Sequence, residues 1–172
     1  VNQVRDSIAQ PTIDELSRRG TPFIGLLYCG LIVTDSGVKV IEFNARFGDP
    51  ETQVVLARLD DDLAELLYQA ATRGLDSKRE VNFSDQVALT VVLASEGYPE
   101  KPVTGRAITG LDQAQRVPGV SIAHAATAHT DGKLVATGGR VLSVVATGDD
   151  FAQARQRAYQ AVSFIDLEGA HF

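Results

Sequence analysis

The sequence predicts an α+β protein, in which antiparallel strand pairs and helices form separate runs along the chain. Two observations lead to this fold class. Strand-like runs come in pairs that are joined by turn residues, such as Asp131-Gly132. Helical periodicity appears between and after these pairs and does not follow every strand, so a parallel sheet built from alternating strands and helices is not expected.

The first part of the chain begins with a helix and a hairpin. Apolar residues at helical spacing predict a helix over 4–19 that is broken near Pro11. β-Branched and aromatic residues predict strands over 23–33 and 38–44. The turn residues of 34–37 join these strands, which predicts an antiparallel hairpin.

Two helix starts follow the hairpin. Asp49 suits the N-cap position, Pro50 the first helical position and Glu51 the positive end of the helix dipole. The acidic residues of 60–62 open a second, amphipathic helix that ends at Gly74. Both starts place acidic or capping residues where backbone N–H groups have no partner within the helix.

The charged stretch 76–80 marks a change in composition, and we expect a domain boundary there. Residues 1–76 would form one domain and residues 77–172 a second one. In the second domain, a continuous apolar run over 87–94 indicates a well-buried strand. Further strands are expected at 103–109, 120–128, 134–137 and 140–147, and a last helix capped by Asp149 or Asp150.

The composition excludes several classes of partner. Of the 172 residues, 44% are hydrophobic and 22% are charged, which is typical of a globular protein with a core. The net charge of −6 argues against nucleic acid and anionic membranes as partners, because both favour basic surfaces. Cys29 is the single cysteine, so an internal disulfide is impossible, which fits a reducing cytoplasm. No apolar run approaches the roughly 20 residues of a membrane-spanning helix.

The segment 40–53 contains the residues that suggest chemistry. Side chains alternate along a strand, so Glu42 and Asn44 are expected on one face, with Arg46 beside them if the strand continues. Carboxylate and amide oxygens suit Mg²⁺, and an arginine fork suits a phosphate or carboxylate. A solvated strand face with a Glu42–Arg46 ion pair is the alternative interpretation. The apolar residues between them would face a core: Ile41, Phe43 and Ala45.

The residues Arg46-Phe47-Gly48-Asp49-Pro50-Glu51-Thr52-Gln53 resemble the signature segment of the phosphoribosylamine–glycine ligase family, also called glycinamide ribonucleotide synthetase. The run Glu42-Phe43-Asn44 resembles the last metal-bearing strand of the ATP-grasp superfamily, to which that family belongs. The likeness covers nearly the whole chain and continues through 23–31, Gly97-Tyr98-Pro99, His124-Ala125 and 138–142, to the alanine-rich last helix.

The resemblance implies the C-terminal part of an ATP-grasp domain over 1–76, followed by the small C-terminal domain of the family. It implies ligation of glycine to phosphoribosylamine with ATP, in purine biosynthesis, through a glycyl phosphate. Mg²⁺ or Mn²⁺ would be held by Glu42 and Asn44, and Arg46 would stabilise the transferring phosphoryl group or the glycyl phosphate. The acceptor site would be lined by Gly48, Asp49, Glu51 and Thr52.

Other segments carry weaker signals. Gly138-Gly139-Arg140 is interpreted either as a bulge between strands or as a backbone nest with a cation for phosphate, so Arg140 is a further candidate for substrate binding. His124 and His129 are five positions apart, an odd spacing, so on one strand they would face opposite sides and could not share a metal. Tyr98-Pro99 is interpreted as a turn.

Two departures from the family pattern limit what the chain can do. The stretch 28–31, which faces Glu42-Phe43-Asn44, contains no carboxylate, so only two protein ligands for the metal are expected. The sequence has no glycine-rich phosphate loop and no lysine placed to clamp ATP, so we expect a part of a longer enzyme that is inactive alone. Two alternatives stay open: another ATP-grasp ligase with a different acceptor, and a non-catalytic nucleotide-binding module. The oligomeric state and a fusion to other purine enzymes are not indicated.

Overall fold

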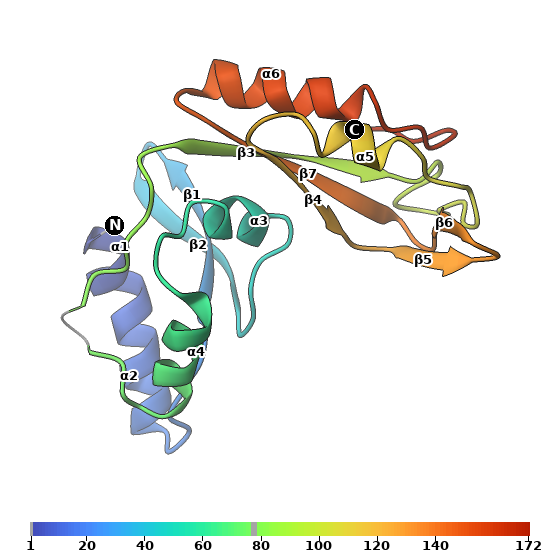
Figure 1. Cartoon of the computed structure of the whole chain (residues 1–172). Coiled ribbons are helices and arrows are strands. Elements are labelled where there is room, and N and C mark those ends of the chain that lie inside the picture. The colour runs from blue at the N-terminus through green and yellow to red at the C-terminus, as the bar shows by residue number, and fades with distance from the viewer. Residues whose placement is uncertain (1, 77–78) are drawn as a thin grey trace. The chain divides into compact units, whose positions relative to one another are not determined.

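The computed structural model describes residues 2–76 and 79–172 and divides into two compact units (Figure 1). The first unit comprises Val1–Asp49 and Asp61–Val81, and the second comprises Pro50–Asp60 and Asn82–Phe172. The short segment 50–60 therefore groups with the second unit. Residues 77 and 78 of the predicted boundary stretch lie outside the described residues, and the boundary at residue 76 stays a prediction.

The first unit opens with a helix that changes type along its length. It consists of α1 (Asn2–Val4), the π-helical turn η1 (Arg5–Ala9) and α2 (Gln10–Arg18). Pro11 has no N–H to donate, and its ring would clash with the carbonyl of the preceding turn in a regular α-helix. Pro11 lies in the first turn of α2, where that N–H is not needed, and the wider π-turn comes directly before it. The predicted break is therefore a change of helix type, and the chain stays helical.

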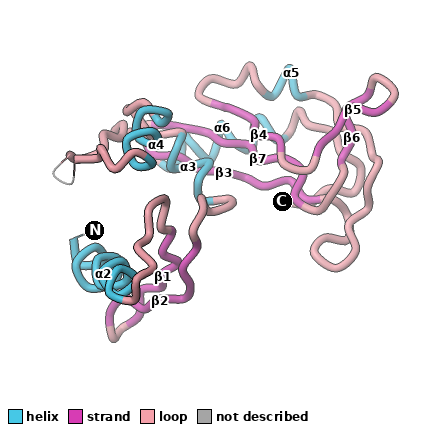
Figure 2. Tube along the Cα trace, turned by 90° about the horizontal axis from the view of Figure 1, so that it is seen from below, coloured by secondary structure: helices cyan, strands magenta, loops and turns pink. Residues whose placement is uncertain are grey.

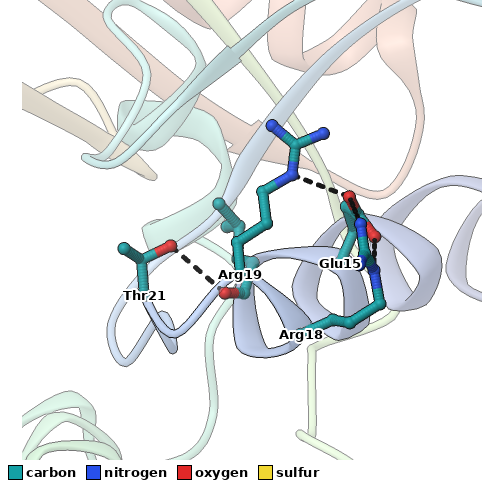
Figure 3. Close-up of polar contacts among 5 residues, drawn as sticks. Glu15, Arg18, Arg19 and Thr21 are labelled. Atoms are coloured by element: carbon teal, nitrogen blue, oxygen red, sulfur yellow. Dashed lines mark hydrogen bonds and ion pairs between the residues drawn. The ribbon is translucent and has the colours of Figure 1, made fainter.

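Side-chain bonds close the end of α2 (Figure 3). The carboxylate of Glu15 accepts hydrogen bonds from Nε of Arg18 at 2.6 Å and from Nε of Arg19 at 2.7 Å. These bonds, that of Arg18 first, lower the pKa of the Glu15 carboxyl below its usual range. Thr21 donates to the carbonyl of Leu16 through Oγ1 at 3.1 Å and through its backbone N–H at 3.0 Å. The helix ends where the sequence predicts.

The predicted hairpin is present in the first unit. It pairs β1 (Tyr28–Thr34) with β2 (Gly37–Asn44) in antiparallel register, and Asp35-Ser36 forms the turn. The strand predicted from residue 23 begins at Tyr28 instead. Gly25 has a φ of +144°, a conformation that L-residues rarely adopt in a strand, so the chain enters the hairpin through irregular backbone.

The hairpin does not bury its apolar residues within the described part of the chain. Ile41 is 67% exposed and Phe43 is 41% exposed. Ala45 is also exposed, so the expectation that these three residues face a core is wrong in this structure. The physical reason is that a two-stranded hairpin has two open faces, and it needs further strands or a helix layer to bury one of them.

Two short helices follow the hairpin in sequence. The helix α4 (Leu63–Ala71), in the first unit, is capped as predicted, because the Asp62 side chain accepts from the backbone N–H of Glu65 at 3.0 Å. The helix α3 (Glu51–Leu56), in the second unit, begins one residue later than predicted, with Pro50 at the N-cap position.

The second unit is built on a three-stranded antiparallel sheet with the order β3-β7-β4, and Figure 2 shows these strands side by side. The helix α6 lies along the sheet (Figure 1) and contacts all three strands. A separate hairpin turns at Asp131-Gly132, as predicted, and both residues have positive φ, as a two-residue type I′ turn requires. The elements are β3 (Val87–Ala94), α5 (Leu111–Ala114), β4 (Val120–His124), β5 (Thr127–Thr130), β6 (Lys133–Ala136), β7 (Arg140–Gly148) and α6 (Phe151–Val162).

Two strand predictions in this unit are wrong. The stretch 103–109 forms only isolated bridges, at Ala107 and Thr109, and no strand. The strand predicted over 120–128 is two strands, because the chain bends at Ala125-Ala126. The first part pairs with β7 and the second with β6, so tertiary pairing decides where the strand divides.

The hydrophobic core lies between the sheet and α6. Ala154, Ala158 and Ala161 are fully buried on one face of the helix, and their small side chains allow it to approach the sheet closely. Residues 141–146 of β7, the central strand, are all buried. Asp150 caps α6 by accepting from the N–H of Gln153 at 2.8 Å, which selects one of the two predicted cap residues.

Candidate functional site

Glu42 and Asn44 lie at the end of β2 with their side chains in contact. The amide Nδ2 of Asn44 donates to Oε1 of Glu42 at 2.8 Å. Glu42 is exposed and Asn44 is half-buried. The two side chains are therefore neighbours on one face, as strand alternation predicts. Because the bond uses the nitrogen of the Asn44 amide, the amide oxygen is not part of it.

The neighbouring strand makes room for this pair. Gly30 is the register partner of Glu42, and Tyr28 is the partner of Asn44. A Cβ at Gly30 would lie 3.0 Å from Cγ of Glu42, which is closer than side chains normally approach. In the sequence, this stretch stands out only because it has no carboxylate. A glycine inside a predicted strand is the signal that could have revealed the close approach.

The oxygens at this position fit a hard cation that is held by few protein groups. Mg²⁺ prefers oxygen ligands and is commonly bound through one or two carboxylates together with substrate phosphates. Glu42 offers a carboxylate and Asn44 an amide oxygen, two residues apart. Within residues 2–76 and 79–172, no three His, Cys, Asp or Glu side chains come together as a possible metal cage. A metal here would depend on phosphate oxygens for the rest of its coordination.

Arg46 lies two residues beyond Asn44, the last residue of β2, and is exposed. Its Nη1 donates to the backbone carbonyl of Phe47 at 2.9 Å. Among the described residues, Arg46 and Glu42 form no ion pair within 4.0 Å, so the alternative interpretation of a surface ion pair between them is not what the structure contains. The guanidinium remains at the strand end that carries Glu42 and Asn44.

The rest of the signature segment runs on towards α3. Gly48 is buried and Asp49 is exposed, and both belong to the first unit. Glu51, which is exposed, and Thr52, which is half-buried, form the first turn of α3 in the second unit. The chain thus passes from one compact unit to the other inside the segment that carries the family likeness.

Arg140 begins β7 in the second unit, and its Nε donates to the hydroxyl of Tyr98 at 3.1 Å. The register of β3 and β7 shifts between Leu93 and Ala94, which pairs Ala94 with Arg140. Neither Gly138 nor Gly139 has a positive φ, which a backbone nest requires at one of its residues. The nest interpretation is therefore wrong, and the register shift at Arg140 is consistent with the bulge interpretation.

Tyr98-Pro99 lies in a turn, as predicted, whereas the two histidines lie on different strands. Tyr98 is 42 residues from Arg140, and no local pattern reveals that the two side chains meet. His124 ends β4, and its Nδ1 lies 3.0 Å from Oγ1 of Thr127. His129 lies on β5, so the two histidines do not share the single strand that the sequence predicted.

Comparison with protein families assigns both parts of the chain. Residues 1–52 match the family model described as phosphoribosylglycinamide synthetase, ATP-grasp (A) domain. Residues 88–172 match the model described as phosphoribosylglycinamide synthetase, C domain. The chain belongs to the phosphoribosylglycinamide synthetase family. The resemblance that the sequence suggested is thereby confirmed.

Relatives of the phosphoribosylglycinamide synthetase family match along the whole chain. Phosphoribosylamine–glycine ligase of Leifsonia xyli subsp. xyli is 60% identical over 100% of this chain and 42% of the relative. The enzyme of the same name from Streptomyces coelicolor is 56% identical over 99% of this chain and 41% of the relative. The trifunctional purine biosynthetic protein adenosine-3 of Gallus gallus is 44% identical over 98% of this chain and 17% of the relative. The chain spans about two fifths of the length of the first two relatives.

Solved structures agree with the family and the fold. The crystal structure of phosphoribosylamine–glycine ligase from Thermotoga maritima has a TM-score of 0.77 at 33% identity, covering 90% of this chain and 37% of that chain. N5-carboxyaminoimidazole ribonucleotide synthetase from the same organism has a TM-score of 0.63 at 18% identity, covering 96% of this chain and 42% of that chain. The second likeness shows the fold alone. The predicted α+β class, with part of an ATP-grasp domain followed by a small domain, is confirmed.

No helix in the described part of the chain is both long and apolar enough to cross a bilayer.

Proposed function

We propose that this chain is part of an ATP-dependent ligase that joins glycine to phosphoribosylamine and yields glycinamide ribonucleotide, ADP and phosphate, a step of purine biosynthesis. One observation carries the proposal. Glu42 and Asn44, whose side chains are joined by a hydrogen bond of 2.8 Å, stand four and two residues before Arg46, inside a segment that matches the ATP-grasp domain of the family. The high identity to two proteins named phosphoribosylamine–glycine ligase supports it.

The reaction has two steps. A carboxylate oxygen of glycine attacks the γ-phosphorus of ATP, the bond from that phosphorus to the β–γ bridging oxygen breaks, and ADP leaves. The amine of phosphoribosylamine then attacks the carbonyl carbon of the glycyl phosphate, loses a proton and expels inorganic phosphate. Both steps move negative charge onto phosphoryl oxygens, so positioned positive groups are the main requirement.

A metal held by two residues of β2, and Arg46 just beyond that strand, would supply the positive charge. Glu42 and Asn44 would hold Mg²⁺ or Mn²⁺ through a carboxylate oxygen and an amide oxygen. The metal, when bound, neutralises charge on the phosphates. Arg46 would donate two parallel N–H bonds to the transferring phosphoryl group, a geometry that its planar fork provides and an ammonium group does not.

The remaining candidate residues would serve the substrates. Gly48, Asp49, Glu51 and Thr52 continue the signature segment, and we assign them to the acceptor site. Arg140, an exposed cation at the start of β7, would bind an anionic substrate group. We also keep the division into an ATP-grasp part, 1–76, and a small C-terminal domain, 77–172, and a cytoplasmic location, which a chain with one cysteine fits.

The test uses the full-length protein and Glu42→Gln. We expect glycine- and phosphoribosylamine-dependent ADP release by the wild type, and at least roughly a hundredfold lower turnover with a higher Mg²⁺ requirement in the variant. The free energy of unfolding should change by less than about 0.5 kcal/mol, because Glu42 is exposed. Glu65→Gln, which changes an exposed carboxylate of α4 in the same way, is the matched control. Normal turnover with unchanged Mg²⁺ dependence would remove Glu42 from the site.

The same assay separates the alternative functions. ADP release that depends on another acceptor amine would indicate a different ATP-grasp ligase. Nucleotide binding without ADP release, under any combination of substrates, would indicate a non-catalytic module.

A further inference from the structure

The strand β3 forms an open edge of the three-stranded sheet. It stands at one end of the order β3-β7-β4, so only one of its sides pairs with β7 (Figure 2). At its last residue the outer side is occupied, because Ala94 exchanges two backbone hydrogen bonds with His171, at 2.9 and 3.0 Å. Alternate residues of a strand direct their N–H and C=O groups to the same side. The other outward groups are therefore those of Ala88, Thr90 and Val92, and within residues 2–76 and 79–172 no backbone group pairs with them.

The composition of β3 leaves this edge unprotected. Its eight residues include no charged side chain and no proline, and all except Thr90 are apolar. Proteins commonly keep edge strands from pairing with other chains by placing lysine or proline on them, or by covering them. An apolar edge without these features is a template for another strand.

One flank of α6 lies above the same edge. Phe151 lines a hollow with the first residues of β3, and Tyr159 contacts the ring of Phe172, close to the residue that pairs with Ala94. The helix therefore runs in the same direction as β3. Phe151, Arg155 and Tyr159 are four residues apart, so they form one stripe on this flank. All three are exposed, Phe151 to 66% and Tyr159 to 40%, and side chains of these types are enriched in protein interfaces.

The strand edge and the helix stripe are both symmetric, as an interface between two identical copies about a two-fold axis requires. With the axis at Thr90, this residue would face its own counterpart, and Ala88 would face Val92 of the second copy. Every outward N–H and C=O would then find a partner. The two α6 helices would run antiparallel, with Phe151 opposite Tyr159, because each lies four residues from Arg155.

The spacing of the elements agrees with this arrangement. The helix α6 packs over β3 and β7. Since neighbouring strands lie about 4.8 Å apart, pairing of β3 with its counterpart would bring the two α6 helices to roughly 10 Å from each other. Packed helices lie about 8–10 Å apart, so the strands and the helices can both make contact in one dimer.

The charges on the flank are complementary in the same arrangement. The guanidinium carbon of Arg155 lies 4.8 Å from the centre of the Tyr159 ring, so its charge is directed towards the C-terminal end of α6. There the second copy would present Asp149 and Asp150, which are exposed and directly precede its Phe151. In the part of the chain that the structure describes, neither Arg155 nor Asp149 has an ion pair within 4.0 Å. Association would give each of these charges a partner.

We propose that β3 and the flank of α6 form a docking surface for a second copy of this chain, paired about a two-fold axis at Thr90 into one continuous sheet. The interface consists of one strand pair and one helix pair, which is at the small end of specific interfaces. Association should therefore be weak, with a Kd that is roughly micromolar or higher. The inference does not depend on the proposed function.

Sedimentation equilibrium of the full-length protein tests the second copy. We expect the weight-average mass to rise from monomer towards dimer between about 1 and about 200 μM. Arg155→Asp and Asp149→Arg should each weaken association at least roughly tenfold, and the double variant should restore it to within about threefold of wild type. Arg116→Asp, which changes an exposed arginine of the same unit, is the matched control and should leave association unchanged. A monomer at every concentration, or a dimer that neither single variant weakens, would overturn the proposal.

Amide hydrogen exchange of the same protein tests the strand edge. The alternate residues of β3 that bond to β7 should be protected at every concentration. The outward amides of Ala88, Thr90 and Val92 should exchange quickly in dilute solution and roughly tenfold more slowly where the dimer predominates. Protection of these three amides in a protein that stays monomeric would mean that another part of the longer chain covers the edge, and the second copy would be the wrong occupant.

Discussion

Arg46→Lys keeps a positive charge at the end of β2 and removes the planar fork. The side chain is exposed, and its Nη1 bonds to the carbonyl of the adjacent residue Phe47 at 2.9 Å. A local contact of this kind contributes little to folding, so the free energy of unfolding should change by less than about 0.5 kcal/mol. Any large change in turnover would then arise from the reaction and not from the fold.

The expected kinetic loss follows from the loss of one preorganised donor. Removing such a donor from a developing oxyanion costs about 10²–10³ in kcat, or roughly 2.7–4 kcal/mol. Because the interaction would form mainly in the transition state, kcat and kcat/KM should fall together while the KM for ATP stays nearly constant. If Arg46 only solvates the strand end, lysine should replace it at a cost of roughly 1 kcal/mol or less.

The assay is steady-state turnover of the full-length protein with glycine, phosphoribosylamine and ATP. Arg19→Lys is the matched control, because Arg19 is an exposed arginine of the same unit that pairs with Glu15 at 2.7 Å. Equal kcat values for wild type and Arg46→Lys would refute the phosphoryl-transfer role of Arg46.

Two further predictions concern the first unit. Gly30→Ala puts a Cβ 3.0 Å from Cγ of Glu42, so Glu42 should shift and the Mg²⁺ concentration for half-maximal velocity should rise; an unchanged Mg²⁺ titration would contradict a tight fit. The pKa of Glu15 is lowered by Arg18 and Arg19, so its stabilisation of α2 is complete above the usual glutamate pKa and is lost as the pH falls through the lowered value. Exchange protection of the Arg19 amide, which bonds to the Glu15 carbonyl, should fall on acidification in wild type; a similar fall in Glu15→Gln would argue against this origin.

Several elements were predictable because their signals are local. Asp62 and Asp150 cap their helices, since each side chain can reach the N–H three residues on. Asp131-Gly132 makes the hairpin turn because both residues tolerate positive φ. The contact of Glu42 with Asn44 follows from strand alternation. Each of these depends on residues within a few positions of one another.

Other features depend on which distant segments pair. The strand predicted over 120–128 divides because one part meets β7 and the other meets β6. The stretch 103–109 has strand-like composition but no ladder partner beyond isolated bridges. The apolar residues of β2 lie on one face of the strand, as alternation predicts, and still remain exposed. Alternation decides which side chains share a face, but only a second layer of structure packed on that face can bury them.

The sequence by itself determined the α+β class and the family, because these rest on composition and on contiguous motifs, and it predicts the residues that would hold a metal and a phosphoryl group. Only the tertiary structure decided that Gly30 makes room for Glu42, and that Arg140 donates a hydrogen bond to Tyr98, 42 residues away. The physical reason is that a side-chain contact between distant segments depends on register and loop path. Those are set by the free energy of packing the whole unit, which no short window of sequence contains.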